Sequence, residues 1–314
     1  MRAAVIDRAG AEPRYGDFPE PEPVTGESLS RIRAAGLHPL VRSLAAGAHY
    51  GSEGVYPLVP GIDGVGTASD GVLRYLGLVR APWGTFAERV AARLGIPLPP
   101  GADPEVIAGT LNPGMSSWLP LRSHVREGKD MGTVVVLGAT GIAGRLAVQN
   151  ALALGAERVV GIGRDEARLA DVRALGAQAV RLADRPSAIV SALDGASPSL
   201  ILDFLWGSAA EQLWSALAAK GFDEKPDHTV HVEIGALAGA SAALPAALLR
   251  SRAFTVRGSG AGSASLAEIM AELPVFMERV ARGEVSAPIE VFPLSRIAEA
   301  WAYRGPRRVV VVPD

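Results

Sequence analysis

A glycine-rich turn in the middle of the chain has the residue types and spacing to bind phosphate groups. The apolar run Val134–Leu137 leads through three glycines into a stretch with the pattern of an amphipathic helix. Such a strand, turn and helix offer free N–H groups and a positive helix end to a pyrophosphate. The residues that we expect to contact a dinucleotide here are Gly138, Ala139, Thr140, Gly141, Ile142, Ala143 and Gly144.

The tip of the next predicted strand indicates which dinucleotide is preferred. About 20 residues past such a turn, folds that bind NAD place an Asp or Glu on the ribose 2′-hydroxyl. Here Arg158–Ile162 is followed by Gly163 and Arg164. A guanidinium can hold a 2′-phosphate through charge-assisted hydrogen bonds of about 1.5–3 kcal/mol. NADP(H) is therefore favoured, and the alternative is a solvated surface arginine beside Asp165 and Glu166.

Composition excludes several classes of protein. The net charge is -2, which gives no field for nucleic acid or an anionic membrane. The chain has no cysteine, which excludes disulfides and cysteine-ligated zinc or iron–sulfur sites. The first residues lack the apolar segment of a signal peptide, and no run is long and apolar enough to span a membrane. We expect a cytoplasmic protein with neither nucleic acid nor membrane as a partner.

The elements that must position the turn can be predicted from the composition and hydrophobic pattern along the chain. The first part is rich in Gly and Pro and has short β-like runs, the middle part alternates strands with alanine-rich helices, and the end returns to β-like runs. The middle strands are predicted at 133–137, 158–162, 200–204, 230–234 and 254–258. This pattern predicts an α/β fold in which a β-rich domain, residues 1–113 plus 284–314, is interrupted by a parallel-sheet domain, residues 114–283.

Four motifs, in this order and spacing, resemble those of the medium-chain dehydrogenase/reductase superfamily and its zinc-free quinone oxidoreductase branch. They are Pro60–Gly66, Gly138–Gly144, Asp203–Gly207 and Arg257–Ser259. The resemblance covers essentially the whole chain. It implies a GroES-like substrate domain interrupted by a Rossmann, doubly wound NADP(H)-binding domain, and hydride transfer from NADPH to a quinone or enone. It also implies a homodimer joined through sheet edges, here at 254–258.

Zinc is not expected. In the alcohol dehydrogenases of the superfamily, the metal ligands stand at positions that match His38, Ile62 and Leu111 here, and one potential ligand cannot hold a tetrahedral site. His228 and His231 have a metal-like spacing, but their odd offset in a predicted strand places them on opposite faces. The sequence therefore predicts no metal site.

Two residues are candidates for catalysis. Without a Lewis acid, a quinone or a conjugated carbonyl is a better acceptor than a simple ketone, because its charge delocalises onto an oxygen that needs hydrogen-bond donors and a proton. Tyr50 resembles the proton-donating tyrosine of the 2-enoyl thioester reductases, or is a half-buried tyrosine without chemistry. His38 stands where quinone reductases usually have an Asn near the nicotinamide ribose. It could donate a hydrogen bond and titrate near neutrality, or simply pack.

Further cofactor contacts are expected by position. Ligands of such sheets bind at the carboxyl ends of the strands. The corresponding residues are Leu205, Trp206, Gly235, Ala236, Gly258 and Ser259, although the glycines could also be bends or helix stops. Arg168, one helical turn after Arg164, could share the phosphate or pair with Asp165 or Glu166.

Two other functions remain open. Asn112-Pro113 is similar to a segment of the 2-enoyl thioester reductases, although Met115-Ser116-Ser117 replaces the Thr-Ala-Tyr expected after it. The chain could also be a non-catalytic NADP(H)-binding sensor or interaction protein. The glycine turn occurs in short-chain reductases and their sensor relatives, but there it lies near the amino terminus, and here more than 130 residues precede it.

Overall fold

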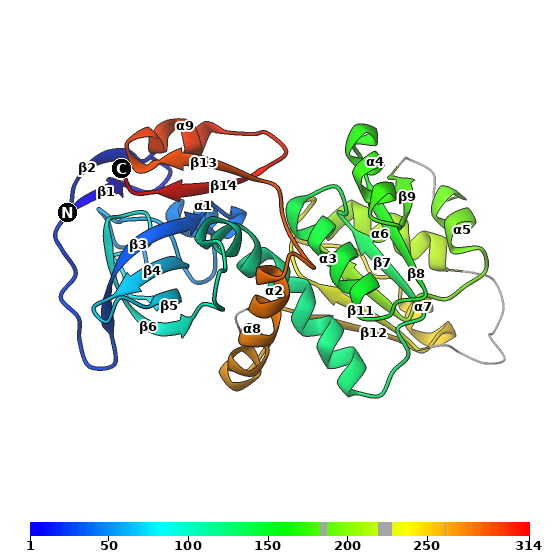
Figure 1. The fold of residues 1–314 in the computed structure, drawn as a ribbon. Helices are drawn as coiled ribbons and strands as arrows, with labels where there is room; N and C mark the ends of the chain where they lie inside the picture. The colour runs from blue at the N-terminus through cyan, green and yellow to red at the C-terminus, as the bar shows by residue number, and fades with distance from the viewer. Residues whose placement is uncertain (183–186, 219–227, 261) are drawn as a thin grey trace. The chain divides into compact units, whose positions relative to one another are not determined.

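The computed structural model describes residues 1–182, 187–218, 228–260 and 262–314, and the chain forms two compact units (Figure 1). Unit 1 comprises Met1–Pro113 and Pro274–Asp314, and unit 2 comprises Gly114–Leu273. The second division lies inside helix α8 (Leu266–Ala281). The sequence-based boundary at 283–284 was set by the return of β-like runs, and it lies just after the end of this helix.

Unit 2 is built on a six-stranded sheet in which every pairing is parallel. Its strand order is β12 (Phe254–Gly258), β11 (Thr229–Glu233), β10 (Leu200–Asp203), β7 (Thr133–Leu137), β8 (Arg158–Gly163) and β9 (Gln178–Arg181). The order reverses at β7, as in a dinucleotide-binding fold. The predicted doubly wound sheet is confirmed.

The sheet of unit 2 is covered on both faces. Val134 and Val136 of β7 belong to one buried apolar cluster, and Val135 and Leu137 belong to another. Alternate residues of a strand point to opposite faces, so this strand is apolar throughout because both of its faces are buried. The covering helices are α3 (Ile142–Ala153), α4 (Glu166–Ala174), α5 (Ser187–Leu193), α6 (Gly207–Leu217) and α7 (Ala246–Ser251).

Unit 1 is a β-rich body, as the sequence predicted. Its main sheet has the order β13, β14, β3, β4, β5, β6, and an additional pairing of β3 with β6 closes part of it on itself. Those strands are β13 (Ile289–Pro293), β14 (Arg308–Val312), β3 (Ser28–Gly36), β4 (Gly64–Ala68), β5 (Leu73–Val79) and β6 (Arg89–Pro97). A separate pair is β1 (Arg2–Val5) with β2 (Arg14–Asp17), and the short helices are α1 (Pro39–Ala45), the 3₁₀ turn Leu294–Arg296 and α9 (Ile297–Ala302).

Helix α2 (Pro104–Arg126) is much longer than the Gly- and Pro-rich sequence suggested. It contains Pro113 and Pro120, each of which removes one backbone hydrogen bond. Its first turn is capped by Asp103, whose carboxylate accepts the N–H of Glu105 at 2.8 Å. Within the ranges described above, no helix is both long and apolar enough to cross a membrane.

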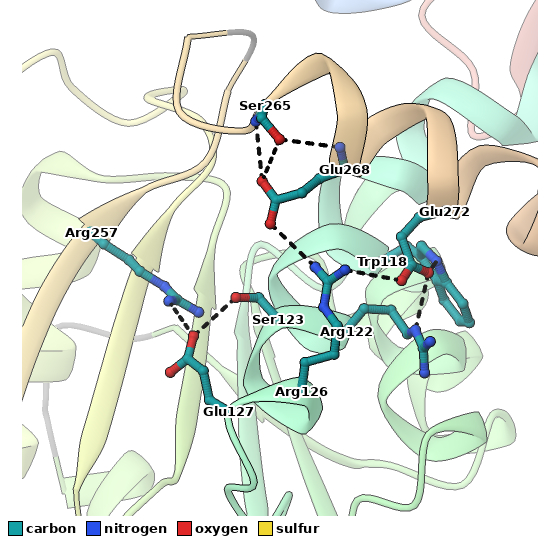
Figure 2. A network of polar contacts seen from close by, with 9 residues as sticks. All are labelled: Trp118, Arg122, Ser123, Arg126, Glu127, Arg257, Ser265, Glu268 and Glu272. Carbon is teal, nitrogen blue, oxygen red and sulfur yellow. Dashed lines mark hydrogen bonds and ion pairs between the residues drawn. The ribbon is translucent and has the colours of Figure 1, made fainter.

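A polar network joins the unit 2 part of α2 to the start of α8 (Figure 2). The side chain of Glu272 is only 5% exposed, and it accepts Trp118 Nε1 at 2.8 Å and Arg122 Nε at 3.0 Å. Arg126 reaches both Glu268 and Glu272 at 3.4 Å. A buried carboxylate needs such partners, so the network fixes α8 against α2 within this unit.

A neighbouring contact fixes the edge strand (Figure 2). Glu127 accepts the guanidinium of Arg257, in β12, at 2.9 Å and the hydroxyl of Ser123 at 3.0 Å. Hydrogen bonds from Lys129 and Arg257 lower the pKa of Glu127 to about 2. The contact ties the end of α2 to β12 as long as Glu127 is ionised.

Candidate functional site

The glycine turn of unit 2 is anchored to the neighbouring strand. Gly138, with φ of +94°, and Ala139 both donate their N–H to the carbonyl of Ile162 in β8, at 2.9 and 3.0 Å. Gly141 then donates to the carbonyl of Gly138 at 3.0 Å and serves as the N-cap of α3. The conformation of the turn is therefore fixed by backbone hydrogen bonds.

Close packing explains why the turn needs glycine. A Cβ on Gly144 would lie 2.2 Å from the carbonyl oxygen of Gly138, and one on Gly163 would lie 2.4 Å from Cγ2 of Thr140. The contact at Gly144 is with backbone, so only glycine lets α3 approach the turn there, whereas a Cβ on Gly163 would displace the side chain of Thr140. Gly163 is the last residue of β8, and Arg164 is thereby held next to the turn.

The start of α3 fits the phosphates of a dinucleotide. The N-cap residue Gly141 offers no side-chain hydrogen bond, and the N–H groups of the first helical turn have no partner within a helix. Such N–H groups and the helix dipole favour an anion. The residues present therefore fit the pyrophosphate that the fold implies.

Arg164 is exposed and forms no ion pair or hydrogen bond with any part of the chain that the structure describes. The acidic neighbours are engaged elsewhere: Asp165 caps α4 and pairs with Arg168 at 3.3 Å. Glu166 pairs with Arg173 at 2.8 Å. Arg164 is therefore available to a ligand, whereas Arg168 makes one of the pairings that the sequence left open.

The remaining expected contacts of unit 2 lie at the carboxyl edge of its sheet. Leu205 follows β10, and its Cγ would be 3.2 Å from a Cβ on Gly138, so it packs against the glycine turn. Gly235 donates its N–H to the carbonyl of Asp203 at 3.2 Å, and Ser259 donates to that of Glu233 at 2.7 Å. The three strand ends are thus hydrogen-bonded to one another in a row beside the turn.

Unit 1 contains a buried polar cluster around His38, which is the N-cap residue of α1. His38 Nε2 lies 3.1 Å from Asp63 Oδ1, and the hydroxyl of Tyr75 donates to Asp63 Oδ2 at 2.6 Å. All three residues are buried. If Nε2–H of His38 donates to the Asp63 carboxylate, then Nδ1 is the ring nitrogen without hydrogen, and this buried atom has no hydrogen-bond partner among the described residues.

Charges in this cluster are balanced by a buried arginine. Burial lowers the pKa of Arg308 to about 10, with the nearby carboxylate of Asp63 opposing that shift, so Arg308 stays cationic at neutral pH. Burial and the charge of Asp63 raise the pKa of Tyr75 well above its ordinary value. Tyr75 therefore remains a neutral donor to Asp63, which keeps that carboxylate in place beside His38.

Tyr50 lies in a surface turn of unit 1. It is 80% exposed, so it is not the half-buried residue that was the alternative. Its ring stacks on His49 with centroids 3.9 Å apart, and it makes no hydrogen bond with the described residues. It is not part of the cluster around His38.

The positions considered for a metal offer few ligands. Ile62 and Leu111 carry no donor atoms. His228 is exposed and contacts Thr255 at 3.0 Å, whereas His231 is buried, so the two point to different sides. Among the residues that the structure describes, no group of three or more potential ligands could hold a metal ion.

Comparison with known proteins assigns the family. No protein-family model matches the chain. Over 363 aligned positions it is 31% identical to a probable NADPH-dependent quinone reductase of Emericella nidulans, and the alignment covers 100% of both proteins. The chain belongs to the quinone oxidoreductase branch of the medium-chain dehydrogenase/reductase superfamily. The resemblance stated from its motifs is confirmed.

Solved structures agree with this family. The quinone oxidoreductase of Thermus thermophilus, solved also as a complex with NADPH, has a TM-score of 0.81 and 29% identity, over 99% of this chain and 100% of that one. A mycobacterial quinone oxidoreductase has a TM-score of 0.81 and 21% identity over 100% of both chains, which shows the shared fold. The chain is therefore an oxidoreductase by family.

Sequence reasoning missed several polar residues of this quinone oxidoreductase family member. Asp63 and Asp203 stood in quoted motifs without a role, and Tyr75 was given none. A signal was present, because a lone acidic residue inside an apolar or glycine-rich run must find partners once it is buried. The motifs that contain Asp63 and Asp203 do not identify these partners, since the partners lie on other elements.

Proposed function

We propose that this protein is an NADPH-dependent reductase that transfers hydride to a quinone or to an α,β-unsaturated carbonyl without a metal ion. One observation carries the proposal. The α3 N-terminus has no side-chain cap, and beside it lies Arg164, whose acidic neighbours already form ion pairs with other residues. The names of the relatives support the same cofactor and acceptor.

The residues of unit 2 would hold the cofactor. The N–H groups of Ile142–Gly144, at the start of α3, would bind the pyrophosphate, and Arg164 would bind the adenosine 2′-phosphate. Leu205, Trp206, Gly235, Ala236, Gly258 and Ser259 would contact the remainder at the strand ends. NADPH supplies the hydride when it is bound.

We assign the proton chemistry to unit 1. Ile62 and Leu111 leave no ligand set for zinc, so charge on the acceptor oxygen has to be met by hydrogen bonds and a proton. His38 is the first candidate, because Asp63 fixes the imidazole through Nε2 and Nδ1 has no hydrogen-bond partner among the described residues. Tyr50 is the second candidate, because its exposed hydroxyl has no competing partner among the described residues.

Assembly and location are also part of the proposal. The described part of β12 pairs on one side, with β11, and stands at the edge of the sheet. An open edge strand is suited to pairing with a second copy, so we propose a homodimer through β12. The cytoplasmic location expected from the sequence stays a prediction.

The test is an acceptor comparison with NADPH and NADH. Oxidation of NADPH should be fast with 1,4-naphthoquinone or a simple enone and slow with a crotonyl thioester, and the purified protein should contain no stoichiometric zinc. The reverse acceptor preference would indicate a 2-enoyl thioester reductase. Tight binding of NADPH without turnover on any acceptor would indicate a sensor.

A further inference from the structure

The turn that follows β10 has a backbone conformation that its sequence does not favour. Trp206 has φ of +54° and ψ of −158°, a backbone conformation that residues other than glycine rarely adopt. Gly207 follows with φ of +55°, and a Cβ there would lie 2.7 Å from the carbonyl oxygen of Ala238. Something in the structure must therefore hold Leu205–Gly207 in this shape.

A buried chain of hydrogen bonds holds the turn. Asp203 Oδ1 accepts the N–H of Leu205 at 2.8 Å and that of Trp206 at 2.9 Å. Asp203 Oδ2 lies 3.0 Å from His231 Nε2, and Trp214 Nε1 donates to His231 Nδ1 at 3.2 Å. The side chains of Asp203 and His231 are 0% exposed, so solvent does not compete for the bonds that His231 makes with Asp203 and Trp214.

The direction of every bond in the chain is determined. An indole N–H can only donate, so Nδ1 of His231 must be the unprotonated nitrogen. His231 is then neutral with its proton on Nε2, which donates to the Asp203 carboxylate. Both carboxylate oxygens are occupied, one by the turn and one by His231. A change at Trp214 is therefore transmitted to the turn through defined donors and acceptors.

The same residues also contact the side chain of the turn. The ring of Trp206 meets Trp214 edge-on, with centroids 5.3 Å apart and an interplanar angle of 83°. It also meets His231 at 5.8 Å and 77°. Trp206 is thus held through its backbone N–H and through its ring by one buried group.

We infer that Asp203, His231 and Trp214 are positioning residues that hold the Leu205–Trp206 turn in the conformation that receives the dinucleotide. The three are fully buried, so they act through the turn and do not touch substrate or cofactor themselves. Leu205 packs against Gly138 of the glycine turn, which links this conformation to the phosphate-binding segment. The inference rests on the proposed function, because it requires a dinucleotide at this edge.

Asp203→Asn is the informative substitution because it preserves shape and removes one acceptor. If the amide oxygen faces the turn, its NH₂ group meets the Nε2–H of His231. If it faces His231, the NH₂ group meets the two turn N–H groups. We expect the dissociation constant for NADPH to rise about tenfold, which corresponds to 1.4 kcal/mol. The near-UV circular dichroism of the Trp206–Trp214 pair should change as well.

A second substitution should rescue the first. Trp214→Phe alone removes the donor to Nδ1 and should weaken NADPH binding about threefold. In the double variant His231 can move its proton to Nδ1, and its Nε2 can then accept a hydrogen bond from the side-chain amide introduced at position 203. The double variant should therefore bind NADPH more tightly than Asp203→Asn alone, which a loss of packing would not produce.

Trp118→Phe is the matched control. Like Trp214, Trp118 is a buried tryptophan of unit 2 with a hydrogen-bonded indole N–H, but its acceptor is Glu272. It should lower the melting temperature and leave the dissociation constant unchanged. Wild-type NADPH affinity in Trp214→Phe, or in a folded Asp203→Asn, would overturn this inference and leave the proposed function standing. A double variant that binds no better than Asp203→Asn would also overturn it. A wild-type protein that binds no NADPH would overturn the proposed function together with it.

Discussion

Replacing Arg164 by Glu is the sharpest test of the proposed cofactor. The side chain is exposed and has no partner among the described residues, so the change should leave the free energy of unfolding within about 0.5 kcal/mol of wild type. What it removes is a guanidinium that would bind the 2′-phosphate. Charge-assisted hydrogen bonds of about 1.5–3 kcal/mol correspond to roughly a 10- to 100-fold weaker affinity for NADPH.

The structure also predicts the size of the discrimination. Asp165 and Glu166 are paired with Arg168 and Arg173, so wild type presents a net positive charge at Arg164. A glutamate there would add repulsion to the lost bonds, so Arg164→Glu should lose more NADPH affinity than Arg164→Ala. NADH lacks the phosphate, and its dissociation constant should change by no more than about twofold.

Calorimetric titration of both dinucleotides at low and moderate salt would measure these effects. The difference between the two variants should shrink with salt, because exposed charges are screened over about 10 Å at 0.1 M. Arg250→Ala, at an exposed position of α7 in the same unit, is the control for a lost positive charge and should change neither affinity. Equal losses for NADPH and NADH, or tighter binding of NADH by wild type, would refute the assignment.

Three further predictions test other parts of the molecule. Gly144→Ala should lower stability by about 1–3 kcal/mol, because its Cβ would meet backbone at 2.2 Å. Gly141→Ala should cost less, since its nearest contact would be 3.4 Å and the change gives up only the preference for glycine over alanine at an N-cap. Equal melting temperatures for the two variants would contradict this packing. Tyr50→Phe should slow turnover at least tenfold if this hydroxyl supplies the proton, and an unchanged rate across pH would remove it from that role. The pKa of Glu127 is lowered from 4.5 to about 2, so its stabilising contribution is full above pH 4.5 and is lost as the pH falls toward 2. Glu127→Gln should flatten this part of an acid-unfolding curve. A curve identical to that of wild type would contradict the pairing with Arg257.

The strands of unit 2 could be predicted because each carries a short run rich in apolar or β-branched residues between helical stretches. The expected runs at 133–137 and 254–258 have the observed bounds. β9 (Gln178–Arg181) was missed, because this short strand has exposed polar ends at Gln178 and Arg181 and no continuous apolar run. Helix α2 was not among the elements given from the sequence. It contains Pro113 and Pro120, and burial of its apolar residues outweighs two lost backbone hydrogen bonds.

The candidate site could be predicted where it is local in sequence and not where it is assembled by the fold. The glycine turn and Arg164 follow from a strand, turn and helix in immediate succession. His38 and Tyr75 both contact Asp63, which lies 25 and 12 residues away from them in the sequence, and they come from separate elements. Pairings of this kind depend on strand register, which single-residue patterns do not specify.

The complete burial of β7 has a consequence for how the protein meets its ligand. All five residues of the strand are buried, the last four with no exposed surface, and the strand is hydrogen-bonded on both sides, to β8 and to β10. Backbone amides in such a strand should exchange with deuterium only when the whole unit opens. The glycine turn that grows from it is therefore preorganised, and little conformational entropy should be lost there on association.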